Sequence, residues 1–146
     1  MSIALGIGCD RGTPVDTLRR AVAQALAQVQ ADWPDVAAVG SITLKADEPA
    51  LQALAAEQGW TITYYTPAQL AAVPVPNPSE TVRRHTGTPS VSEAAALLGA
   101  GAGTEAVAGA AATALLLEKH KLKGGDGRNA TVSVARCDVR HRRQPP

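Results

Sequence analysis

Three short apolar segments, at residues 3–9, 36–44 and 61–65, are each followed by a segment with the spacing of a helix. Apolar runs of this length, rich in β-branched residues, are typical of buried strands. Strands that alternate with helices through short connections predict parallel pairing by right-handed crossovers. This alternation restricts the first half of the chain to an α/β sheet with helices packed on its faces.

The helices of this half begin at proline-containing signals. Thr13 precedes Pro14, which predicts a threonine cap with proline at the first helical position. Asp47 is the expected N-cap of the second helix, and Glu48 would lie in its first turn. A short third helix is expected after Thr66, which also precedes a proline.

The second half of the chain has a different character. Three prolines within residues 73–80 exclude regular structure there. The sequence Ser-Val-Ser-Glu at 90–93 has the pattern of a capping box and predicts a further helix. Residues 113–118 and 130–136 resemble two strands joined as a hairpin.

We therefore predict a single α/β domain over residues 3–136. It is expected to be a three-layer sandwich, with a mainly parallel central sheet of about five strands and a C-terminal hairpin. Residues 137–146 are expected to form a polar, disordered tail.

Composition restricts the partners and the compartment. The formal net charge of +1 excludes a strongly basic nucleic-acid-binding protein. No apolar run approaches the roughly 18 residues of a membrane-spanning helix, and the first residues lack a signal-peptide pattern. Cys9 and Cys137 lie far apart and define neither a disulfide framework nor a zinc site. We expect a reduced, cytoplasmic protein with no metal, no other cofactor, no nucleic-acid partner and no membrane association.

Basic residues are concentrated near the C-terminal end. Residues 119–143 contain eight basic and two acidic side chains, so the rest of the chain is net negative. Lys119, His120 and Lys121 lie at the end of a predicted strand, so both lysines should face one side and the histidine the other. The hairpin and the tail therefore carry a positive patch that the total charge conceals.

Loops that follow parallel strands gather at one edge of a sheet, where ligands commonly bind. The first such loop contains Arg11 and Gly12 beside the positive end of a helix, which favours an anion such as a carboxylate or phosphate. A surface arginine at a simple turn is an equal alternative. In the second loop, Lys45 is a candidate anion contact and Glu48 a candidate acid or base. A structural role is the favoured alternative for Asp47 and Glu48.

Five short segments occur in a fixed order along the chain. They are Gly-Ile-Gly-Cys at 6–9, Leu-Lys-Ala-Asp-Glu-Pro at 44–49, Pro-Asn-Pro-Ser-Glu at 76–80, Gly-Thr-Pro-Ser-Val at 87–91 and Asn-Ala-Thr-Val at 129–132. Together they resemble the cobalamin-biosynthesis family of CobE and the C-terminal domain of CbiG, the cobalt-precorrin-5A hydrolase. The resemblance extends over nearly the whole chain, from about residue 3 to about residue 136.

The resemblance implies an α/β domain that binds a corrin-ring precursor, whose edge carries acetate and propionate carboxylates. It implies a substrate-binding set drawn from these segments and from the basic hairpin. The expected substrate-binding residues are Cys9, Arg11, Gly12, Lys45, Asp47, Asn77, Ser79, Glu80, Thr88, Ser90, Lys119 and Lys121. Glu48 is the candidate catalytic acid or base.

Three functions remain open at this point. The first is binding of a polycarboxylate corrin precursor by a stand-alone protein like CobE. The second is hydrolysis of a precorrin lactone with release of acetaldehyde, as the resemblance to CbiG implies. The third is a non-catalytic partner or carrier that docks on other enzymes of the pathway through the basic hairpin.

Two positions depart from the family pattern. Asp10 stands where the family usually has the first arginine of Gly-Cys-Arg-Arg-Gly. Thr43 stands where an acidic residue usually precedes Leu-Lys-Ala-Asp-Glu. Residues 100–112, rich in alanine and glycine, resemble an insertion before the last two strands.

Overall fold

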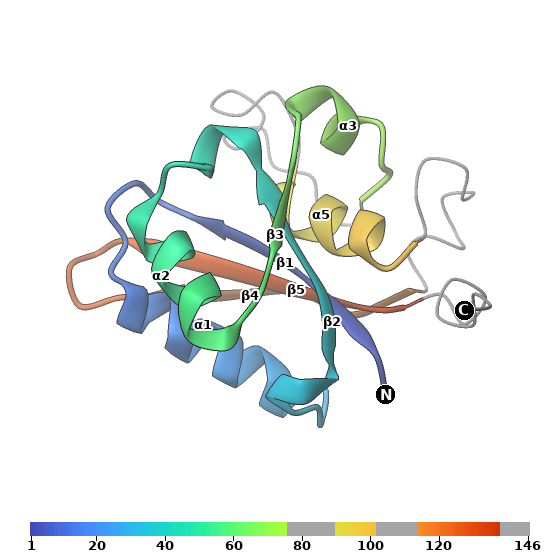
Figure 1. Ribbon diagram of the computed structural model, residues 1–146, viewed down its shortest axis with the longest axis horizontal. Helices are drawn as coiled ribbons and strands as arrows, with labels where there is room; N and C mark the ends of the chain where they lie inside the picture. The colour runs from blue at the N-terminus through green and yellow to red at the C-terminus, as the bar shows by residue number, and fades with distance from the viewer. Residues whose placement is uncertain (76–89, 102–113, 138–146) are drawn as a thin grey trace.

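The computed structural model describes residues 1–75, 90–101 and 114–137, and within them it contains a five-stranded sheet of order β3-β2-β1-β5-β4 (Figure 1). The strands are β1 (Ile3–Cys9), β2 (Val36–Ile42), β3 (Ile62–Tyr65), β4 (Leu115–Lys123) and β5 (Asn129–Arg136). The helices are α1 (Val15–Gln28), α2 (Pro49–Gln58), α3 (Pro67–Ala71) and α5 (Val91–Gly99), with 3-10 turns η1 (Trp33–Asp35) and η2 (Thr43–Lys45). Three predicted segments lie outside the described residues: the proline-rich loop from residue 76 onward, the alanine-rich stretch from residue 102 onward and the polar tail after residue 137.

The α/β class and the terminal hairpin are confirmed, but the sheet is mixed rather than mainly parallel. β1, β2 and β3 are parallel, whereas β5 runs antiparallel to both β1 and β4. The reason lies in how the two hairpin strands are buried. β5 is buried over most of its length and takes the inner position, whereas β4 alternates between exposed and half-buried residues and forms the edge.

Helices cover both faces of the sheet, as the predicted three-layer sandwich requires. Figure 1 shows α1 and α2 on one side of the strands and α3 and α5 on the other. Ile3, Leu5 and Ile7 of β1 are fully buried in the core beneath α1 and α2. Ala4, from the same strand, belongs to the second core beneath α5.

Helix α5 lies very close to β1 and runs against its direction. A Cβ at Gly6 would come within 1.8 Å of the carbonyl oxygen of Ser92, so only glycine permits this approach. Val91 lies over Gly8 near the end of β1, while Gly99 lies over the start of the strand. The N-terminus of α5 therefore lies at the carboxyl end of β1.

Two predicted helix caps are wrong in detail. α1 begins one residue late, with Pro14 as its N-cap, and the Thr13 hydroxyl donates to the Asp10 carbonyl at 2.7 Å instead. α2 begins at Pro49, so Glu48 rather than Asp47 is its N-cap. α1 thus begins directly after its proline and α2 begins at its proline, while the Thr13 and Asp47 side chains bond to loop groups instead of capping the helices.

The helix predicted after residue 90 is present, but its capping box is incomplete. Ser90 is the N-cap of α5, yet its side chain makes no capping hydrogen bond. By contrast, Thr66 and Gln69 form both bonds of a capping box at the start of α3. No helix among the described residues is long and apolar enough to cross a bilayer.

Candidate functional site

The loops that follow β1 and β2 meet at the carboxyl edge of the sheet, and Arg11 joins them. Its Nη1 lies 2.7 Å from Asp47 Oδ1 and 3.5 Å from Glu48 Oε2, and its Nη2 donates to the Leu44 carbonyl oxygen. The hydrogen bond from Arg11 holds the pKa of Asp47 below its usual value. The guanidinium nitrogens Nη1 and Nη2 thus already bind groups of the protein, although 56% of the Arg11 side chain remains exposed.

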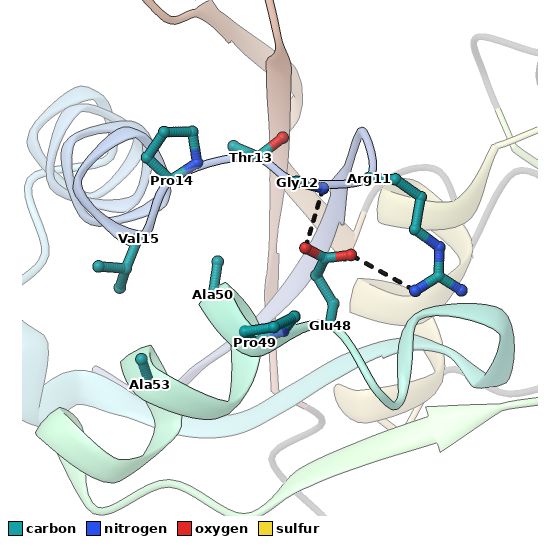
Figure 2. Close-up of a pocket in the computed structure, with 9 residues that line it drawn as sticks. All are labelled: Arg11, Gly12, Thr13, Pro14, Val15, Glu48, Pro49, Ala50 and Ala53. Atoms are coloured by element: carbon teal, nitrogen blue, oxygen red, sulfur yellow. Dashed lines mark hydrogen bonds and ion pairs between the residues drawn. The ribbon is translucent and has the colours of Figure 1, made fainter.

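Glu48 is the buried member of this cluster, since only 3% of its side chain is exposed. Its Oε1 accepts a hydrogen bond from the Gly12 amide at 3.0 Å, while its Oε2 faces Arg11. Gly12 has a φ of 79°, a left-handed conformation that favours glycine. Figure 2 shows the Glu48 carboxylate directed from the start of α2 toward the Gly12 backbone. The two donors offset the cost of burying a carboxylate here.

A pocket of about 540 Å³ lies beside this cluster, between the first turns of α1 and α2 (Figure 2). It is lined by Arg11, Gly12, Thr13, Pro14, Val15, Glu48, Pro49, Ala50 and Ala53. Its walls are mainly apolar, and Glu48 and Arg11 supply the charged groups. Small-molecule sites commonly combine an apolar wall with a few polar groups in this way.

Cys9 and Lys45 lie near the same junction. Burial, followed by the charge of Glu48, raises the pKa of the Cys9 thiol to about 11, while the charge of Lys45 acts in the opposite direction. Cys9 is therefore a neutral thiol near pH 7 and is unsuited to act as a thiolate nucleophile. Lys45 ends η2 and is partly exposed, and within the described ranges it forms no ion pair.

A second set of contacts holds the β1–α1 loop from the hairpin side, and sequence reasoning missed it. The Asp10 carboxylate accepts from the backbone and side-chain nitrogens of Asn129, at 2.8 and 3.2 Å. Arg128 Nε donates to the Arg11 carbonyl at 2.9 Å, and its guanidinium covers Gly12. The glycine-rich turn at 124–128 was a signal for a hairpin, but nothing local linked it to Asp10 (117 to 119 positions separate the bonded pairs).

Lys119 and Lys121 lie on β4, the edge strand that pairs with β5. Lys121 pairs with Thr131, whose hydroxyl donates to Gly8 on the α5 face, so Lys121 belongs to that face. His120 points the other way and bonds Gln24 and Gln28 of α1, as the predicted alternation requires.

The structure thus divides the predicted site residues into groups. The loops beside the pocket bring together Cys9, Arg11, Gly12, Lys45, Asp47 and Glu48. The start of α5 and the edge strand carry Ser90, Lys119 and Lys121. Asn77, Ser79, Glu80 and Thr88 lie outside the described residues. The roles of all these residues remain predictions.

Comparison with known proteins gives a consistent set of relatives. Residues 3–135 match the family model described as cobalamin synthesis G C-terminus. The chain is 38% identical over 133 residues to the cobalt-precorrin-5A hydrolase of Priestia megaterium, which covers 91% of this chain and 32% of that protein. It is 37% identical over 100 residues to protein CobE of a Sinorhizobium species, covering 67% of this chain and 65% of that protein.

A solved structure supports the same relationship. The crystal structure of CobE, a protein from the cobalamin biosynthetic pathway, matches with a TM-score of 0.75 at 30% identity. The match covers 94% of this chain and 91% of that one. The chain nevertheless spans only about a third of the length of the hydrolase and just under two thirds of the Sinorhizobium protein.

Proposed function

This chain belongs to the cobalamin-biosynthesis family of CobE and the CbiG C-terminal domain, and we propose that it binds a polycarboxylate corrin-ring precursor. The observation that carries the proposal is the convergence of the loops after β1 and β2, which Arg11 joins through Asp47 and the Leu44 carbonyl. A ligand with several carboxylates needs several cations at one edge of the protein. Lys45, Arg11 and Arg128 supply them from three separate parts of the chain.

The three cations differ in whether they already have partners within the protein. Arg11 fixes Asp47 and Glu48, and Arg128 is bonded to Asp126 at 3.0 Å. Lys45 has no such commitment among the described residues, so its ammonium is the principal contact for a substrate carboxylate in this proposal. Charge-assisted hydrogen bonds of this kind are stronger than neutral ones and weaken as salt is added.

Titration with hydrogenobyrinic acid, followed by its visible absorbance, tests the proposal. We expect binding at low salt, weaker binding at high salt, and weak binding of the fully methylated ester, which lacks the carboxylates. Lys45→Met should lower the affinity about tenfold, the effect of about 1.4 kcal/mol. Arg20→Met, which removes a cation from the exposed side of α1, is the matched control and should bind as the wild type does.

Absence of binding at low salt would overturn this proposal. In that case, salt-sensitive capture of another cobalamin-pathway enzyme by the purified protein would point instead to the docking alternative. Reversing the charges of Lys121 and Lys123 should then abolish capture.

A second candidate function, lactone hydrolysis, is favoured by the position of Glu48 beside the pocket and by the likeness to a cobalt-precorrin-5A hydrolase. In that reaction Glu48 would take a proton from a water as its oxygen adds to the lactone carbonyl. The carbonyl–oxygen bond of the ring then breaks. The released alkoxide collapses to acetaldehyde as its carbon–carbon bond to the macrocycle breaks, and the macrocycle carbon takes up the proton that Glu48 received. Since both Glu48 oxygens already face donors, the geometry favours binding over this chemistry.

Acetaldehyde release from a precorrin-5A-type lactone separates the two functions. If the chain is a hydrolase, Glu48→Gln should lose at least about a hundredfold in rate, the scale of general-base catalysis, while still binding hydrogenobyrinic acid. The control is Glu57→Gln, which changes a carboxylate of α2 that does not line the pocket and should keep its activity. A fully active Glu48→Gln protein would remove Glu48 from the mechanism.

A further inference from the structure

We propose that the N-terminal turn of α5, the Ser90 hydroxyl and the Lys121 ammonium together bind one carboxylate of the substrate. The proposal rests on the proposed corrin-binding function and adds to it a second anion subsite. This subsite lies on the α5 face of the sheet, whereas the pocket at Glu48 lies between α1 and α2 on the other face.

Ser90 provides the first observation. The residue is 1% exposed, and its Oγ is buried without a hydrogen-bond partner. Buried hydroxyls in folded proteins are nearly always paired. As the N-cap of a nine-residue helix, Ser90 places this hydroxyl beside the first amides of α5, which have no acceptor within the helix. The Ser90 hydroxyl is thus a donor without a partner at the place where α5 begins.

The direction of α5 brings these donors to the edge where the loops gather. Val91 lies 3.9 Å from the position of a Cβ on Gly8, the residue before the end of β1. Ser90 precedes Val91 and therefore lies farther toward that edge. The dipole of α5 directs its positive end the same way.

A chain of hydroxyl groups connects the start of α5 with the edge strand. Ser133 Oγ lies 2.9 Å from Ser92 Oγ and also donates to the Glu118 carbonyl oxygen of β4. β4 runs in the same direction as β1, because both are antiparallel to β5. Lys121 is therefore closer than Glu118 to the carboxyl edge of the sheet. Ser90 precedes Ser92 in α5 and is closer than Ser92 to the same edge. Ser90 and Lys121 therefore both lie on the carboxyl-edge side of the Ser92–Ser133–Glu118 contacts, one on α5 and the other on β4.

The charges around the subsite favour an anion. Glu93 is fully buried in the first turn of α5. Glu93, Glu118 and Lys119 each already have an interaction partner. Lys121 is exposed and, among the described residues, forms no ion pair. Lys123 follows on the same face and is also exposed without an ion pair in the described ranges, and Lys121 is the nearer of the two to Glu118 along β4.

The chemistry fits an acetate or propionate group on the corrin edge. One carboxylate oxygen would accept from the Ser90 hydroxyl and an α5 amide, and the other would accept from Lys121. Helix N-termini bind anions through this combination of free amides and dipole. A lysine adds charge without demanding one geometry.

Two readouts test the subsite. In the hydrogenobyrinic acid titration, Ser90→Ala and Lys121→Met should each weaken binding about tenfold, which corresponds to about 1.4 kcal/mol. Arg136→Met removes a cation from the opposite end of β5 and should leave the affinity unchanged. In two-dimensional amide NMR, sodium propionate should shift the amides of Val91, Ser92 and Glu93, and sodium chloride of equal concentration should not.

The outcomes separate the subsite from the wider function. Wild-type binding of hydrogenobyrinic acid with unchanged affinity in both variants would overturn the subsite and leave the proposed function standing. No wild-type binding would overturn the proposed function, whereas propionate shifts that disappear in Ser90→Ala and Lys121→Met would still support the carboxylate subsite. Propionate shifts that persist in both variants would count against it.

Discussion

At the scale of single residues, the most informative side chain is Glu48. Its carboxylate connects a loop that ends β1 to the start of α2, through the Gly12 amide and Arg11. Asp47 is exposed and its carboxylate forms an ion pair with the Arg11 guanidinium, so it is not used to cap α2. Two neighbouring acids therefore lie in different surroundings, Glu48 buried against a backbone amide and Asp47 at the surface.

Cys9 reports on this electrostatic environment. Its raised pKa, about 11, predicts slow alkylation by iodoacetamide near pH 8 and a rate that rises until the pH passes about 11. Because the charge of Glu48 contributes to the increase, Glu48→Gln should lower the pKa of Cys9, and Lys45→Met should raise it further. The alkylation rate of each variant as a function of pH measures both shifts.

The matched control is the Lys121→Met protein, because Lys121 is not one of the charged residues that shift the pKa of Cys9. Its alkylation profile should equal that of the wild type. An ordinary thiol pKa near 8.5 in the wild type would contradict the buried, anionic surroundings described for Cys9. The raised pKa also means that Cys9 favours folding below pH 9 and that this contribution is lost as the pH rises through about 11.

At the scale of elements, the packing of α5 on β1 depends on glycine. Gly6→Ala places a Cβ within 1.8 Å of the Ser92 carbonyl oxygen, a backbone atom that cannot move away alone. We expect the free energy of unfolding to fall by about 1–3 kcal/mol or more, the usual cost of overpacking. Urea unfolding followed by circular dichroism measures the change.

Gly125→Ala is the control for the change of residue type. No atom lies within 4 Å of a Cβ at Gly125, and its backbone does not need a positive φ. Its unfolding midpoint should remain close to that of the wild type. Equal midpoints for Gly6→Ala and the wild type would show that α5 is not held against β1 as described.

The elements themselves were largely predictable from the sequence, whereas their order in the sheet was not. Periodicity located β1, β2, β3 and the hairpin because burial imposes a local pattern on each strand. The insertion of β5 beside β1 depends on which hairpin strand has the more buried faces, a property of the assembled sheet. Local patterns also placed the caps of α1 and α2 on Thr13 and Asp47, since those patterns do not show which side chains a distant loop engages.

The candidate site divides in the same way. Arg11, Lys45 and Glu48 were identified because they follow predicted strands, and such positions meet at one edge. Asp10 and Asn129 were missed as a pair, since 119 positions separate them and neither lies in a pattern that requires the other. Only the antiparallel placement of β5 brings them together.

At the scale of the whole molecule, stability should be greatest around β1. This strand is buried on both faces and pairs with β2 on one side and with β5, over seven residues, on the other. β3 is a four-residue edge strand whose residues are exposed or half-buried, and α3, beside it, has five residues. Opening the β3–α3 end therefore exposes much less apolar surface than separating β1 from β5.

Native-state hydrogen exchange should resolve this difference. We expect the β1 and β5 amides to exchange only through global unfolding, with the free energy given by urea denaturation, and the β3 amides to exchange through a smaller local opening. Gly6→Ala should lower the protection of β1 and β5 by its full loss of stability and change the β3 amides less, because their local opening does not require α5 to leave β1. Equal protection of β3 and β1 in the wild type would instead mean that the sheet opens as one cooperative unit and that the mixed topology does not divide its stability.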